Sequence, residues 1–166
     1  MAVITRTPAT ATSLTFAPTS LGSSATLVAG YESSAYDIDA AGAIDVRVTG
    51  TITVGTSPTV NTTIEIWAIG TLDHSGTYPD VFDGTASTET VTSRNVLAAC
   101  GKCIQTITVD NTSDRTYVID ATLGLHYGAI LPDTVVFFVV HNTGVNLNST
   151  GGNHTLKVTP LTYTST

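Results

Sequence analysis

A strict alternation of apolar and polar side chains between Ile44 and Val54 limits what this chain can fold into. In an extended backbone one face of this segment carries Ile44, Val46, Val48, Ile52 and Val54. The opposite face carries Asp45, Arg47, Thr49, Thr51 and Thr53. A period of two is typical of a strand in a sheet that buries one face and exposes the other to water. Gly50 interrupts the apolar face, which predicts a bend or a bulge there.

The composition extends this prediction to the whole chain. Threonine makes up about a fifth of the 166 residues, whereas charged residues make up only 11%. Thr, Val, Ile and Tyr fit a pleated, half-buried surface, and a helical protein would carry more Glu, Lys and Ala on its exposed faces. A chain of this length buries a core without a metal or a disulfide. We therefore expect one all-β domain.

The charge pattern argues against two classes of partner. The formal net charge is −7, and the basic residues are scattered singly at Arg6, Arg47, Arg94, Lys102, Arg115 and Lys157. Nucleic acid and anionic membrane surfaces both need clustered basic side chains, so we expect neither as a partner. The first residues do not have the layout of a secretory signal, and no stretch has the length of a membrane-spanning helix. If the chain is complete, we expect it to be made in a cytoplasm.

Eight extended segments can be recognised by alternation or by short apolar runs between turn residues. They are Ala25 to Tyr31, Ala35 to Ile38, Ile44 to Val54, Asn61 to Gly70, Ile104 to Val109, Tyr117 to Ile119, Val135 to Val140 and Thr155 to Tyr163. The continuous apolar run from Val135 to Val140 predicts a central strand buried on both faces. This number of short strands favours a two-sheet antiparallel sandwich, with a jelly-roll order preferred.

Three further segments are not expected to be strands. Thr71 to Thr92 is long and polar and predicts a surface loop. Ser93 to Gly101 predicts a short helix, which Ser93 would cap and Gly101 would end, and a helical turn is expected between Leu123 and Leu131. Residues 1–22, rich in Thr, Ala, Ser and Pro, form either a disordered tail or an extended arm that pairs with a neighbour. We place the sandwich domain at residues 23–166.

The motif Cys100-Gly101-Lys102-Cys103 has the spacing of a thiol redox site. Redox pairs lie at the first turn of a helix, where the helix N-terminus favours the thiolate. Here the pair lies at the end of the expected short helix, and a second pair that would complete a zinc site is missing from the sequence. We expect two ordinary thiols; a metal site completed by His74 or His126 is the alternative.

The acidic and aromatic residues suggest no catalytic site. Glu65 and Trp67 share one face of their strand and offer half of a glycosidase carboxylate pair or a platform for a sugar ring, but a core or interface Trp fits better. The Asp73 to Asp83 loop lacks the spacing of a calcium loop. His141 flanks an apolar segment, so we expect it to be packed or hydrogen-bonded rather than a ligand. We expect no enzyme, no cofactor and no metal.

Five stretches, taken in order, resemble a group of small structural proteins of tailed bacteriophages. They are SATLVAGYES (24–33), GTSPT (55–59) leading to IEIW (64–67), YPDVFDG (78–84), TSDRTY (112–117) and HNTGVNLN (141–148). The similarity spans roughly residues 20 to 163. It implies a virion component on the capsid exterior, a decoration (cement) protein with a jelly-roll-like sandwich that binds the major capsid protein. Such a protein would be a homotrimer.

An assembly role leads to specific expectations. We expect residues 1–21 to order only on the particle, since nothing in them forms a core alone. The residues expected at assembly contacts are Met1, Val3, Ile4, Phe16, Leu21, Trp67, Tyr78, Asp80 and Phe82. The alternatives are a tail-associated or carbohydrate- or receptor-binding module that uses Trp67 and Tyr78, and a sandwich-type enzyme that uses Glu65 or the Asp73 to Asp83 loop.

Overall fold

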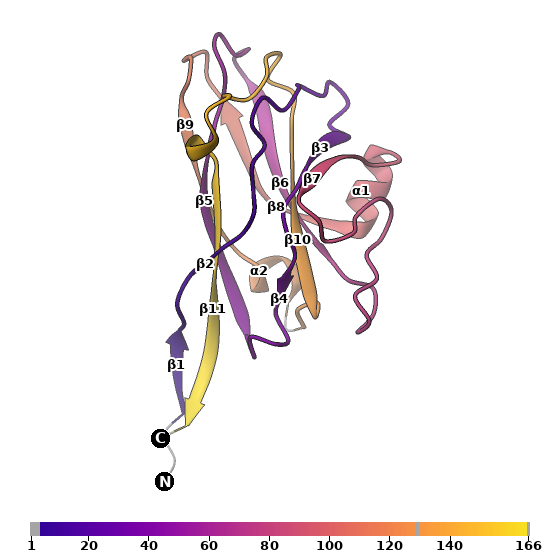
Figure 1. Ribbon diagram of the computed structural model, residues 1–166, viewed down its shortest axis with the longest axis vertical. Coiled ribbons are helices and arrows are strands. Elements are labelled where there is room, and N and C mark those ends of the chain that lie inside the picture. The colour runs from indigo at the N-terminus through magenta and orange to yellow at the C-terminus, as the bar shows by residue number, and fades with distance from the viewer. Residues whose placement is uncertain (1–3, 129, 166) are drawn as a thin grey trace.

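The computed structural model of the chain describes residues 4–128 and 130–165. Two antiparallel sheets pack face to face (Figure 1). The first contains β1 (Ile4–Pro8), β2 (Thr12–Ser13), β5 (Asp45–Thr53), β9 (Thr116–Thr122) and β11 (Thr155–Ser165). The second contains β3 (Ala29–Glu32), β4 (Tyr36–Asp37), β6 (Thr62–Gly70), β7 (Ser87–Thr90), β8 (Gly101–Val109) and β10 (Thr134–His141). The helical elements are α1 (Arg94–Cys100), α2 (Gly124–Tyr127) and a 3₁₀ turn, η1 (Gly151–Asn153).

The strand order is that of a jelly roll. In the first sheet β2 pairs with β11, β11 with β5 and β5 with β9. In the second, β3 pairs with β10, β10 with β6 and β6 with β8. The chain therefore crosses repeatedly from one sheet to the other, and the two sheets have the strand orders β2-β11-β5-β9 and β3-β10-β6-β8. This is the double Greek-key arrangement of a jelly roll. The predicted two-sheet, jelly-roll-like sandwich is confirmed.

The alternation in β5 builds the main core. Val46, Val48, Ile52 and Val54 are fully buried between the sheets, whereas Ile44 remains more than a third exposed. The prediction of a bulge at Gly50 was wrong, because the pairing of β5 with β9 and β11 continues in register through it. Gly50 instead allows close approach of β11: a Cβ there would lie 2.1 Å from the carbonyl oxygen of Thr155.

The central strand β10 is buried on both faces, as its continuous apolar sequence predicts. Its alternate residues contribute to two apolar clusters: Val135, Phe137 and Val139 face the main core. Val136, Phe138 and Val140 face outward from the sandwich, into a second cluster. This second cluster must be covered by another part of the chain.

The segment from Thr71 to Thr92 provides that cover, so its interpretation as a surface loop holds only for part of it. Within it β7 pairs with β3, and Phe82 and Val91 are buried in the second cluster. The ring of Phe82 packs edge-on against Phe138 with centroids 5.1 Å apart. Helix α1 completes the cover with buried Leu97. The predicted helix ends are confirmed, since the Ser93 side chain accepts a hydrogen bond from the N–H of Val96 and Gly101 follows the last turn.

The N-terminal segment is integrated into this domain rather than separate from it. Strand β1 pairs antiparallel with the end of β11, and β2 pairs with Lys157 and Val158 of the same strand. Phe16 and Leu21 are buried in the main core. The expectation that residues 1–21 order only on a particle was therefore wrong for these two side chains. Both belong to the main core, where the ring of Phe16 lies edge-on to that of Tyr31 with the ring centroids 6.0 Å apart.

Candidate functional site

Glu65, Trp67 and Arg94 form a compact cluster on the outer side of the second sheet. The indole Nε1 of Trp67 donates to Glu65 Oε2 at 2.8 Å, and Arg94 Nη2 lies 2.6 Å from the same oxygen. The Arg94 guanidinium also stacks over the Trp67 ring, 4.7 Å from its centroid. Trp67 is only 6% exposed. Its ring is therefore a core element and not an accessible platform for a sugar or a contact with a partner.

The other expected contacts in the covering segment also serve the fold. Phe82 is buried in the second cluster, so it is not available to a partner. Asp80 is exposed, but its carboxylate accepts hydrogen bonds from the backbone N–H and the hydroxyl of Thr92, at 2.9 and 2.6 Å. Tyr78 is half-buried, and burial raises the pKa of its hydroxyl well above the ordinary value. Phe82 thus fastens the segment to the sheet, and Asp80 ties two parts of the segment to each other.

Glu32 was missed by sequence reasoning. It lies at the end of β3 and is completely buried. Its Oε1 accepts the backbone N–H groups of Gly84 at 2.8 Å and of Asp83 at 3.3 Å, whereas its Oε2 has no hydrogen-bond partner within the described residues. Burial raises the pKa of Glu32 to about 7, with smaller contributions from the negative charges of Asp83 and Glu89. The only sequence signal for this site is an acidic residue beside apolar ones.

His141 is packed and hydrogen-bonded, as expected. Its Nε2 lies 3.1 Å from the carbonyl oxygen of Leu21, and its Nδ1 lies 3.0 Å from the Thr143 hydroxyl. A carbonyl oxygen only accepts, so Nε2 carries the hydrogen. Burial lowers the pKa of the imidazole to about 4, which keeps the ring neutral. His141 thereby ties the N-terminal segment to the end of β10.

The two cysteines do not have the surroundings of a redox pair. Cys100 is the last residue of α1, and Cys103 lies in β8; both are free and partly buried. Burial raises the pKa of the Cys100 thiol, which opposes thiolate formation. Over residues 4–128 and 130–165, no three His, Cys, Asp or Glu side chains are grouped so that they could hold a metal ion. Within the same residues, no helix is long and apolar enough to cross a bilayer.

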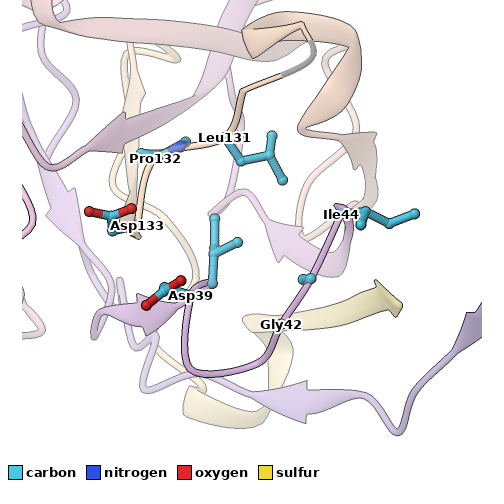
Figure 2. Close-up of a pocket in the computed structure, with 8 residues that line it drawn as sticks. Asp39, Gly42, Ile44, Leu131, Pro132 and Asp133 are labelled. Carbon is cyan, nitrogen blue, oxygen red and sulfur yellow. The ribbon is translucent and has the colours of Figure 1, made fainter. Parts of the chain in front are cut away.

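One end of the sandwich carries a pocket of about 290 Å³. Two loops line it, residues 38–44 after β4 and residues 131–133 before β10. The carboxylates of Asp39 and Asp133 lie near each other at one side, and Leu131 and Ile44 lie at the other (Figure 2). Asp133 is paired with His74, whose Nδ1 lies 2.8 Å from it. The pocket therefore combines acidic and apolar walls.

The same end of the molecule presents the most exposed apolar side chains. Leu125 in α2 and Ile130, which precedes the pocket-lining Leu131, are each 83% exposed. Ile4, an expected contact, is 70% exposed on β1. Met1 and Val3, also expected contacts, lie outside the described residues. This end has the features of a docking surface: exposed apolar side chains with polar groups around them.

Comparisons of the chain with protein-family models, with curated proteins and with solved structures found no match.

Proposed function

We propose that this chain is a structural protein of a bacteriophage virion, a capsid decoration (cement) protein that binds the exterior of the shell formed by the major capsid protein. One observation carries the proposal: Leu125 and Ile130, each 83% exposed, are the most exposed large apolar side chains of the described residues, and they lie at one end of the sandwich. Apolar side chains exposed in this way favour contact with another protein. The resemblance of the sequence to small phage structural proteins supplies the identity of that protein.

The polar side chains of the sandwich support a binding role rather than catalysis. Glu65 is occupied by Trp67 and Arg94, and Asp80 by Thr92. A catalytic carboxylate must instead reach a substrate. The burial of Trp67 also removes the sugar platform on which a carbohydrate-binding role was based.

A binding assay with particles that lack the protein tests this proposal. The purified chain is mixed with such particles and centrifuged, and the bound fraction is measured. We expect stoichiometric co-sedimentation, and we expect the Leu125→Asp, Ile130→Asp double variant to lose most of it because charged side chains resist burial in an interface. Val60→Asp, an exposed site in the β5–β6 connection at the opposite end, is the matched control. Equal binding of all three proteins would contradict the docking surface, and no binding by the unaltered chain would contradict the function.

A further inference from the structure

Strand β1 and the last residues of β11 form a two-stranded ribbon that projects beyond the body of the sandwich (Figure 1). Every residue of β1 is exposed. A two-stranded ribbon is marginally stable in water when nothing packs against it. The ribbon therefore needs a partner surface to be rigid, and the chemistry of its two faces indicates which one.

The register assigns the ribbon's side chains to two unlike faces. Thr5 lies opposite Thr164 and Thr7 opposite Thr162, so these four hydroxyl-bearing side chains share one face. The other face carries Ile4, Arg6, Pro8, Leu161 and Tyr163. Ile4 is 70% and Tyr163 58% exposed. This second face, called here the donor face, is apolar and has Arg6 as its one charged residue.

A surface that complements the donor face lies at the same end of the molecule. It is the acidic pocket with Asp39 and Asp133 on one side and Leu131 and Ile44 on the other (Figure 2). Asp39 is exposed, and the net charge of −7 makes a site for a cation favourable on this chain. The backbone N–H of Ile44 donates to the carbonyl oxygen of Leu161 at 2.8 Å, so pocket and ribbon base are neighbours.

We propose that the donor face docks on the acidic pocket of a second copy of this chain, with the Arg6 guanidinium on the exposed carboxylate of Asp39, beside the Asp133–His74 pair. Ile4 and Tyr163 then cover the apolar side of the pocket, at Ile44 and Leu131. Arginine suits this role because its planar fork pairs with two carboxylate oxygens at once. The donor face and the acidic pocket are different surfaces at the same end of each copy. Each copy can therefore bind one neighbour through its ribbon and another through its pocket, and such a head-to-tail contact can close into a ring.

This inference rests on the proposed function in one respect only, which is that a decoration protein would use this self-association. It leaves Leu125 and Ile130 free for the shell. A closed ring gives each copy two such contacts, one through its ribbon and one through its pocket.

The mass of the purified chain in solution, measured by sedimentation velocity, tests the inference. We expect a closed oligomer for the unaltered chain and association weaker by roughly tenfold or more for Arg6→Glu and for Asp39→Lys, since each places like charges together. Combining both changes in one chain exchanges the charges and should restore the oligomer. Lys102→Glu on β8 makes the same charge change away from the ribbon and should have no effect.

Two results would overturn the inference: a monomeric unaltered chain, or single variants that keep the full oligomer mass. A monomer whose Arg6→Glu variant no longer binds particles would identify the shell protein as the occupant of the ribbon, and the proposed function would stand. An oligomer that shows the expected charge dependence but binds no particle would support the inference and contradict the proposed function.

Discussion

The buried carboxylate of Glu32 accepts the backbone N–H of Gly84 at 2.8 Å and so fastens the 71–92 segment to β3. Because the pKa of Glu32 is raised to about 7 from 4.5, the folded protein binds this proton more tightly than the unfolded chain does. The stability due to the protonated carboxyl is fully present below pH 4.5 and is lost as the pH rises through about 7.

We therefore expect the free energy of unfolding of the unaltered chain to fall, relative to that of Glu32→Gln, by on the order of 3 kcal/mol between about pH 4.5 and pH 8. Urea titrations of both proteins across this range measure the difference. His141 and His154, whose pKa values are lowered by burial, act in the opposite direction, but they are present in both proteins and cancel. A difference that does not change with pH would show that Glu32 is not protonated by burial.

Gly50 provides a test of the packing between β5 and β11. A Cβ at this position would meet the Thr155 carbonyl oxygen at 2.1 Å, which the two paired strands can relieve only by moving apart. Gly50→Ala should therefore destabilise the protein by about 1–3 kcal/mol in urea unfolding. Gly22→Ala is the control, because no atom lies within 4 Å of a Cβ there, and it should change stability by no more than about 0.5 kcal/mol. Equal effects of the two substitutions would contradict the close approach.

The cluster of Glu65, Trp67 and Arg94 predicts a stability effect without a catalytic one. Glu65→Ala leaves the indole N–H and the guanidinium without their acceptor and should cost about 1–3 kcal/mol. Glu65→Gln retains an acceptor and should cost less. Asp120→Asn weakens an exposed ion pair with Arg47 and serves as the control, with a smaller expected change because water screens that pair. If Glu65→Ala were as mild as the control, the cluster would have no role in holding α1 against β6.

His141 predicts how acid affects the N-terminal segment. Since the folded pKa of His141 is lowered to about 4 from 6.5, its contribution to stability is present above pH 6.5 and is lost as the pH falls toward 4. His141→Leu removes this dependence and, by leaving the Leu21 carbonyl without its donor, should increase hydrogen exchange around Leu21 at neutral pH. His74→Gln is a useful contrast, since the ion pair with Asp133 raises the pKa of His74 and gives the opposite sign. Unchanged exchange at Leu21 would contradict the anchoring role.

Local patterns predicted those parts of the fold that local physics controls. The alternation in β5 identified its buried side chains, and Ser93 and Gly101 marked the ends of α1. The apolar run at 135–140 identified the central strand. In each case the information lies in the periodicity or capping of neighbouring residues, which one sequence contains.

The rest depends on partners distant in sequence. Val81 and Phe82 stand side by side among turn residues, and only the second cluster, which is formed largely by β6 and β10, explains why Phe82 is the one that is buried. Phe16 was taken as part of an arm for the same reason, since its partner Tyr31 is not a near neighbour. The acidic pocket joins Asp39 to Asp133, and no local pattern brings those two carboxylates together.

The central claim is that this chain acts by attachment to a phage shell, and imaging of an intact particle by cryo-electron microscopy tests it most directly. We expect density for the sandwich in many copies over the outside of the capsid, with the Leu125 end toward the shell. Density confined to the tail, or no density for this chain in the particle, would contradict it.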